Sequence, residues 1–172
     1  GDDKELTNLF TRVGRIQFII MSLILSGFIF FGKPFISFWA GNGYEEAYII
    51  TLLLIIPATV PLIQNLGIEI QRAKNKHKAR SIVYLFIAIA NVFISIPLIK
   101  RFGPSGAAFG TTLSLTAGNI IFMNWYYHKR LGINIKYFWI NIAKFIPAFI
   151  LPTVVGIIGM KLKYDNVLKL GI

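Results

Sequence analysis

Cysteine is absent from this chain of 172 residues, and histidine occurs only twice, as His77 and His128. These absences exclude disulfide frameworks, thiolate metal sites and histidine-rich metal clusters. Charge is also scarce, because charged residues make up 15% of the chain, against about 25% in ordinary soluble domains. Its apolar stretches hold no carboxylate pair and no Ser-His-Asp order, so the sequence predicts no catalytic site, no metal site and no cofactor.

The uncharged parts of the chain are long apolar runs. Hydrophobic residues account for 55% of the chain, and its mean hydropathy is +0.65. The 22 residues between Glu46 and Glu69 carry no charge, residues 81–99 form another uncharged run, and residues 102–128 contain no Lys, Arg, Asp or Glu. A soluble domain of this size could not bury several such segments. The composition therefore excludes a soluble globular enzyme, a disordered chain and a nucleic-acid-binding domain.

The apolar runs predict five membrane-spanning helices. A span needs about 20 mostly apolar residues, and it must be helical because lipid offers the backbone no hydrogen-bond partners. The expected spans cover residues 13–32, 47–68, 81–99, 105–126 and 137–160, and Lys33-Pro34 is expected to end the first. The predicted fold is an all-α, polytopic transmembrane helix bundle. Because the chain opens on Gly1 and stops soon after a basic stretch, we expect it to be part of a longer protein.

Positive charge is distributed unevenly between the predicted loops. Alternate loops carry 11 Lys and Arg on one side and 6 on the other, and by the positive-inside rule the richer side, with the start of the chain, is cytoplasmic. The strongest topology anchors lie between the second and third spans, and they are Arg72, Lys74, Lys76, Lys78 and Arg80. Because two spans flank this run, we interpret it as an orientation signal in contact with anionic lipid head groups, and expect no nucleic-acid partner.

Aromatic residues bracket the loop between the fourth and fifth spans, as an interfacial belt would. This set comprises Trp125, Tyr126, Tyr127, Tyr137 and Trp139. Trp39 and Tyr44 are expected to lie at the opposite interface.

The second span has the most unusual polar content. Pro57 and Pro61 are four residues apart and share one helix face, where each removes a backbone hydrogen bond and predicts a bend. Gln64 and Asn65 lie close to the same stripe. Bent or broken helices that present amides are common in transporters, so Gln64 and Asn65 are substrate-path candidates. The alternative is a packing kink in which the amides bond to a neighbouring helix.

Three further features lie inside the predicted spans. Asn91 either bonds across helices or contacts a substrate. Lys144, the one charge well inside a span, either extends to the interface or binds an anionic group in a wet cavity. Gly106, Gly110 and Ser114 form a stripe of small residues, which favours close helix packing over a phosphate-binding loop because no strand precedes it.

Several short motifs occur in an order that resembles one family of membrane proteins. They are residues 1–5, residues 38–47 (FWAGNGYEEA), Asn65, residues 71–78 (QRAKNKHK), Asn91 and residues 96–108 (IPLIKRFGPSGAA). Over residues 33–115 the chain resembles the second half of bacterial polysaccharide flippases, the lipid-linked oligosaccharide exporters of the MATE-like multidrug/oligosaccharidyl-lipid/polysaccharide superfamily. The resemblance fades in the fifth span.

This resemblance implies a transporter of about 12–14 helices in two bundles around a central cavity. Its substrate would be an undecaprenyl-linked oligosaccharide, moved by alternating access from the cytoplasmic to the outer leaflet of the bacterial inner membrane for a surface polysaccharide such as O-antigen. The implied partners are the lipid bilayer, the lipid-linked oligosaccharide and the N-terminal half of the same protein. Cationic residues that hold the lipid pyrophosphate are expected in that half, and this chain supplies Lys144 at most.

Three other functions stay open at the level of sequence. A cation-coupled multidrug exporter of the same superfamily generally needs membrane-embedded carboxylates, and these spans offer only Glu69, near an end. A membrane polymerase or glycosyltransferase needs acid/base residues in large loops, whereas the loops here are about 5–15 residues long. A non-catalytic membrane subunit is the third.

Overall fold

The computed structural model of the chain is built of helices. It describes residues 2–41, 43–76, 78–150 and 153–154, which contain no strand. In chain order the elements are α1 (Asp2–Ala40), α2 (Glu46–Ile63), α3 (Leu66–Ala73), α4 (Lys78–Phe102), α5 (Pro104–Leu115), the π-helix η1 (Thr116–Met123), α6 (Asn124–Leu131) and α7 (Ile135–Ala143). Residues 146–150 are also helical. The predicted all-α fold is confirmed.

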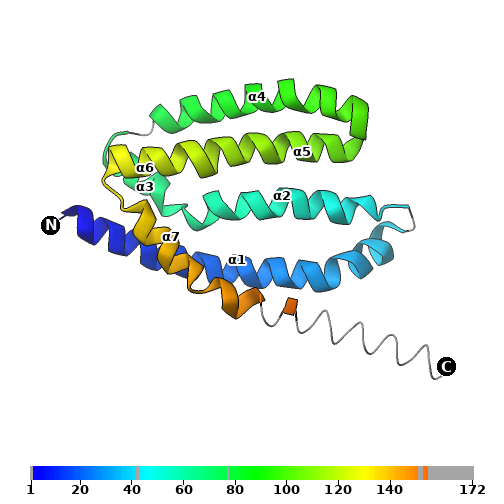
Figure 1. Ribbon diagram of the computed structural model, residues 1–172, viewed down its shortest axis with the longest axis horizontal. Coiled ribbons are helices and arrows are strands. Elements are labelled where there is room, and N and C mark those ends of the chain that lie inside the picture. The colour runs from blue at the N-terminus through cyan, green and yellow to red at the C-terminus, as the bar shows by residue number, and fades with distance from the viewer. Residues whose placement is uncertain (1, 42, 77, 151–152, 155–172) are drawn as a thin grey trace.

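Four long helices lie side by side in the order α1, α2, α5, α4 (Figure 1). The long helices alternate in direction along the chain, and η1 and α6 continue α5 without a break. α7 packs across the first half of α1. The start of α1 and the α2–α3, α3–α4 and α6–α7 connections therefore lie toward one end of the bundle, and the α1–α2 and α4–α5 connections lie at the opposite end (Figure 1).

Among the described residues, four helical segments are long and apolar enough to cross a membrane. They are α1, α2, α4 and the continuous helix Pro104–Leu131, with 39, 18, 25 and 28 residues. Large apolar side chains cover their outer surfaces, and Leu23, Phe31 and Phe93 are each at least 70% exposed. Soluble monomers rarely expose contiguous apolar surface on this scale. The bundle therefore has the length and surface of a membrane-spanning protein.

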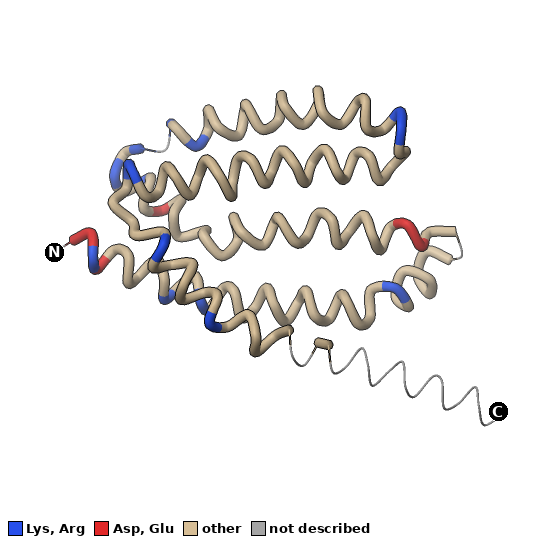
Figure 2. The backbone as a smooth tube through the Cα atoms, viewed as in Figure 1, with Lys and Arg blue, Asp and Glu red and all other residues tan. Residues whose placement is uncertain are grey.

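Lys and Arg concentrate at the end of the bundle where α1 begins (Figure 2). Eleven of the described Lys and Arg lie there, within residues 2–15, 69–80 and 129–136, against three at the opposite end. We call these three segments together the basic end. The grouping of loops that underlies the predicted charge asymmetry is thus also a grouping in space.

Two predicted spans have boundaries that differ from the structure. The first was expected to end at Lys33-Pro34, but α1 continues through Pro34 to Ala40, so this prediction is wrong. Proline removes one hydrogen bond and bends a helix without always ending it, and α1 curves toward α2 near its C-terminal end (Figure 1). The second span, 47–68, is not one continuous helix, because a two-residue turn separates α2 from α3. A bent or broken helix was expected here, and the break falls at Gln64 and Asn65, after both prolines.

The predicted fifth span, 137–160, is only partly covered by the described residues. α7 begins within two residues of its expected start, and a turn at Lys144 and Phe145 separates α7 from the helical residues 146–150. Residues 151–152 and 155–160 of this predicted span lie outside the described residues. The third span, 81–99, lies within α4, and the fourth, 105–126, lies within the continuous helix from α5 to α6.

The largest buried side chains pack at the basic end. Phe10, Tyr127 and Phe138 are each at most 2% exposed, and the Phe10 ring lies 5.7 Å from the Tyr127 ring and 4.9 Å from the Phe138 ring. Gly67 of α3 admits Tyr127, because a Cβ there would lie 2.6 Å from its ring. The prediction that Tyr126 and Tyr127 form an interfacial belt is therefore wrong, since they are 8% and 2% exposed.

The stripe of small residues on α5 lies against α4. A Cβ at Gly106 would overlap the Leu98 carbonyl, and a Cβ at Gly110 would overlap the Ser95 hydroxyl. Ser114, 3% exposed, donates its hydroxyl hydrogen to the Gly110 carbonyl. The two helices approach so closely only because this face of α5 carries no larger side chain.

Asn91 of α4 bonds across the same interface. Its Oδ1 accepts hydrogen bonds from the Ser95 hydroxyl at 2.7 Å and from the Thr111 hydroxyl of α5 at 3.2 Å. Asn91 thus connects α4 to α5.

Replacing Gly106 by Ala should destabilise the protein, because the added methyl group meets the α4 backbone. Overpacking of this kind typically costs about 1–3 kcal/mol. Gly27→Ala is the matched control, since a Cβ there meets nothing within 4 Å and alanine favours a helix by up to about 1 kcal/mol over glycine. Unfolding in detergent micelles measures both variants, and equal stabilities for the two would contradict the close contact.

Candidate functional site

α2 contains two prolines shortly before it ends. Pro57 and Pro61 have no N–H, so the carbonyl groups four residues earlier lose their helical partners. The Leu53 carbonyl, freed by Pro57, instead accepts a 2.7 Å hydrogen bond from the Thr112 hydroxyl of α5. A neighbouring Ser or Thr satisfies a freed carbonyl in this way inside apolar bundles. The helix can therefore keep its prolines and still leave this group paired.

The turn between α2 and α3 directs its two amides to different surroundings. Gln64 is 2% exposed, and its Nε2 donates a 2.7 Å hydrogen bond to Asn124 Oδ1 at the start of α6. The indole N–H of Trp139 in α7 donates to the same oxygen at 3.1 Å. Asn65, by contrast, is exposed. One asparagine thus joins the α2–α3 turn to α6 and α7.

The π-helix η1 places a second buried asparagine near Asn124. Hydrogen bonds in a π-helix run from residue i to i+5, and such segments are frequent at functional sites. Asn119 is 2% exposed, and Asn124, five residues later, is 9% exposed. Asn124 Nδ2 donates to the carbonyl groups of Ile120 at 2.6 Å and Asn119 at 3.5 Å. The i+5 repeat therefore allows both asparagines to face the interior of the bundle.

Asn119 connects this interior to an arginine at the basic end. Its Oδ1 accepts a 3.0 Å hydrogen bond from the Tyr84 hydroxyl of α4. Arg80 donates to that hydroxyl at 2.9 Å and to the Tyr127 hydroxyl at 3.3 Å, and its guanidinium lies 4.9 Å from the Tyr84 ring centroid. We call the following residues the polar cluster: Gln64, Arg80, Tyr84, Asn119, Asn124, Tyr127 and Trp139.

Some buried polar atoms have no hydrogen-bond partner among the described residues. They are both amide atoms of Gln71, the Thr11 hydroxyl and Asn119 Nδ2. Gln71 is 0% exposed and Thr11 is 2% exposed. Buried polar groups in native proteins are rarely left unpaired, because each costs about 1–3 kcal/mol. These atoms are therefore candidates for contact with a polar ligand or with another part of the protein.

Two of the predicted topology anchors cap a helix. Lys74 Nζ donates to the Leu131 carbonyl at 2.8 Å, and Lys76 Nζ donates to the Arg130 carbonyl at 2.7 Å. Both carbonyls end α6, where helical partners run out and a positive charge is favourable. The Tyr126 hydroxyl in turn donates to the Lys76 carbonyl at 3.2 Å. The α3–α4 connection is thereby held to the end of α6.

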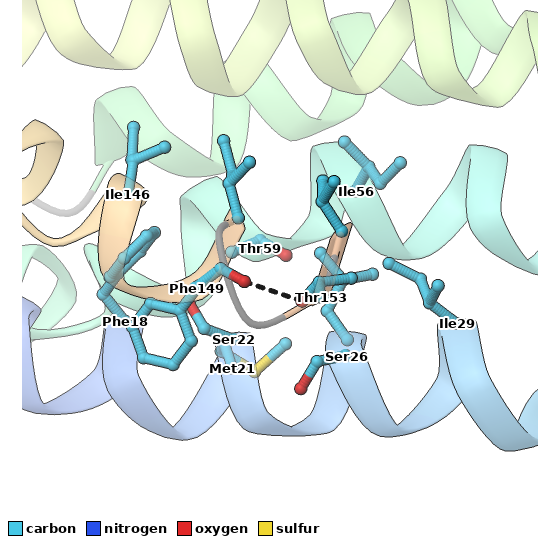
Figure 3. Close-up of a pocket in the computed structure, with 13 residues that line it drawn as sticks. Phe18, Met21, Ser22, Ser26, Ile29, Ile56, Thr59, Ile146, Phe149 and Thr153 are labelled. Carbon is cyan, nitrogen blue, oxygen red and sulfur yellow. Dashed lines mark hydrogen bonds between the residues drawn. The ribbon is translucent and has the colours of Figure 1, made fainter. Parts of the chain in front are cut away.

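An apolar groove lies between α1, α2 and the helical residues after α7 (Figure 3). Its volume is about 450 Å³, and Phe18, Ile56 and Phe149 are among the side chains that line it. Its polar lining groups are hydroxyls, such as those of Ser22 and Thr59, and no described lining residue is charged. The groove can therefore accommodate hydrocarbon, but it offers little to a charged group.

One of the four substrate-path candidates belongs to the polar cluster. Gln64 lies in it, whereas Asn65 is exposed, Asn91 bonds at the α4–α5 interface and Lys144 is exposed in the turn after α7. No side-chain hydrogen bond joins these four to one another in the described part of the chain. The structure thus does not assemble them into one site.

Sequence reasoning missed most of the polar cluster. Asn119 and Asn124 lie inside the predicted fourth span, where amides are as unusual as those of the second span, and this signal could have singled them out. Arg80 was interpreted only as a topology anchor, and Trp139 only as part of an aromatic belt. No periodicity in the sequence indicates the π-helix that positions the asparagines.

The fold and the site together define the class of protein to which the chain belongs. The chain is an all-α helix bundle whose long helices are apolar enough to cross a membrane, and a polar cluster is buried near its basic end. Comparison with protein-family models, with curated proteins and with solved structures finds no match to this chain.

The hydrogen bond between Gln64 and Asn124 predicts energetic coupling. Asn124→Leu leaves the Gln64 amide and the Trp139 indole N–H unpaired, so it should be destabilised by about 1–3 kcal/mol or more. Gln64→Leu removes one hydrogen bond while Asn124 keeps its other partners, so it should lose only about 0.5–1.5 kcal/mol. The double variant should lose less than the sum, with a coupling energy of about 0.6–1.7 kcal/mol, as for side-chain bonds between membrane helices. The free energy of unfolding in detergent micelles is measured for the wild type, both single variants and the double variant. Asn65→Leu, which changes an exposed amide, is the control. Strictly additive losses would show that the amides act independently.

Proposed function

We propose that this chain is part of a transporter that flips a polyprenyl-linked oligosaccharide from the cytoplasmic to the outer leaflet for surface polysaccharide synthesis. The observation that carries the proposal is the break between α2 and α3, which directs a buried amide into the polar cluster of an otherwise apolar bundle. Discontinuous helices form the substrate sites of many secondary transporters. The resemblance of residues 33–115 to oligosaccharide-lipid exporters supports the choice of substrate.

Such a substrate has an apolar part and a polar part, which are stable in different surroundings. Its hydrocarbon tail is most stable against apolar surface, which the groove of Figure 3 and the outer helix faces provide. Its sugar hydroxyls and phosphates need hydrogen-bond partners when they leave water, and the amides, hydroxyls and guanidinium of the polar cluster are of that kind. The polar and apolar surfaces of one bundle therefore suit the two parts of the lipid.

The mechanism we propose is alternating access in the bacterial inner membrane. The basic end faces the cytoplasm, as the positive-inside rule requires, so the polar cluster lies near the leaflet from which the substrate is collected. The bundle then rocks against the N-terminal half of the same protein, and the bend and break around Pro57, Pro61 and Gln64 allow α2 and α3 to move separately.

Loss of the protein should trap the substrate on the cytoplasmic side. Deleting the gene for the full-length protein should make lipid-linked oligosaccharide accumulate in the inner leaflet, which extraction of lipid intermediates measures. The deletion should also remove the surface polysaccharide, which surface staining measures. Normal surface polysaccharide after deletion would contradict the proposal. Raised sensitivity to cationic dyes with normal polysaccharide would instead favour a multidrug exporter.

Asn65 gives a sharper genetic prediction, because its amide is exposed beside the α2–α3 break. In the deletion strain, Asn65→Ala should restore export only partly, at a protein abundance equal to that of the wild type. The control is Asn8→Ala, which removes another exposed amide near the start of α1. Full export by Asn65→Ala would leave this residue outside the substrate path.

A further inference from the structure

A recess opens at the basic end between α3 and the first turn of α4. Its volume is about 610 Å³, within the range of ligand-binding pockets. Its described lining residues are Ile68, Arg72, Asn75, Arg80 and Ser81. Two guanidinium groups, one amide and one hydroxyl therefore border a single opening, and none of these lining residues is acidic.

The turn that carries Arg72 and Asn75 has a defined shape. Asn75 has a φ of 52°, the left-handed conformation that Asn adopts more readily than most residues. Its N–H donates to the Arg72 carbonyl at 3.0 Å, and the Lys76 N–H donates to the Gln71 carbonyl at 2.7 Å. These two bonds form a Schellman motif, which satisfies the last carbonyls of α3. One wall of the recess is therefore preformed.

Arg80 brings a half-buried positive charge to the recess. Its side chain is half-buried, and the hydroxyls of Tyr84 and Tyr127 hold its guanidinium at 2.9 and 3.3 Å. No carboxylate among the described residues forms an ion pair with it. A partly desolvated and fixed charge of this kind is stabilised by an anion placed beside it.

The second guanidinium of the recess is held loosely. Arg72 pairs with Glu69 at 2.9 Å, but these side chains are 65% and 61% exposed. Exposed pairs contribute little, because water and salt screen them. An anion in the recess therefore competes with Glu69 for Arg72 at low cost.

The recess lies where a bilayer surface is expected. α2 and α4, which are both apolar enough to span a membrane, lie on either side of it along the chain. We propose that the recess binds the phosphate of an anionic phospholipid head group from the leaflet that meets the basic end. A guanidinium group can donate two parallel hydrogen bonds to two oxygens of one phosphate. Asn75 and Ser81 supply further hydrogen bonds to the head group.

This lipid site shares Arg80 with the polar cluster, whereas its other lining residues lie outside that cluster. The bound phosphate neutralises Arg80, which Tyr84 links to Asn119 in the polar cluster. Occupancy by an anionic head group therefore stabilises the cluster as well as the α3–α4 connection.

The test is a lipid titration of the purified full-length protein in a neutral detergent. Thermal unfolding is followed as short-chain phosphatidylglycerol, short-chain phosphatidylcholine or inorganic phosphate is added. Phosphatidylglycerol should raise the unfolding temperature at the lowest concentration. Arg72→Ala and Arg80→Gln should each raise its half-saturating concentration about fivefold, as expected for one basic residue at an anionic surface. Lys100→Ala, at the other end of α4, should leave it unchanged.

Glu69→Gln separates lipid binding from a purely structural role of the Arg72–Glu69 pair. Because Glu69 competes for Arg72, its neutralisation should leave the affinity for phosphatidylglycerol equal or higher, whereas a structural role predicts the same loss as Arg72→Ala. Wild-type affinity in Arg72→Ala and Arg80→Gln would overturn the proposal. Equal protection by phosphatidylcholine would also overturn it, and equal protection by inorganic phosphate would assign the recess to a soluble anion.

Discussion

Polar groups inside an apolar bundle must find their partners within the protein, and this constraint governs the rest of the structure. The Leu53 carbonyl that Pro57 frees is paired by Thr112, and the amide of Gln64 at the α2–α3 break is paired by Asn124. Each of these bonds joins elements far apart in the chain. The α2–α3 break is therefore compatible with a packed bundle because its buried amide is paired across helices, and in the π-helix Asn119 Oδ1 is likewise paired with the Tyr84 hydroxyl of α4.

The basic end combines this pairing with the largest part of the aromatic core. Tyr127 packs against Gly67 and Phe10, and its hydroxyl also accepts a bond from Arg80. Lys74 and Lys76, which the positive-inside rule treats only as charges, also hold the α3–α4 connection to α6. The same residues thus contribute to orientation and to local structure.

Hydropathy was sufficient to predict the all-α fold and the four long apolar helices of the described residues, because about 20 apolar residues in a row have few alternatives to a helix in lipid. The residues at which the helices end or break were not predictable from hydropathy. Pro34 lies within α1, and the second span is divided at Gln64 and Asn65. Whether a proline bends, breaks or merely weakens a helix depends on partners in other helices, which a single segment does not contain.

The candidate site was less accessible to sequence reasoning. Gln64 was singled out for its position in an apolar span, but its partners Asn124 and Trp139 come from helices whose rotation depends on packing and on the π-helical register. Asn65 follows Gln64 directly and yet is exposed, because a turn replaces the helix at this point. Spacing along an ideal helix therefore could not place the pair.

Flipping by the purified full-length protein is the most direct test of the account. The protein is reconstituted into phospholipid vesicles that contain a fluorescent polyprenyl-pyrophosphate oligosaccharide, and a membrane-impermeant quencher is added outside. If the protein flips this lipid, the quenched fraction should rise above the outer-leaflet share found in protein-free vesicles. An equal quenched fraction in vesicles with and without the protein would contradict the proposed flipping.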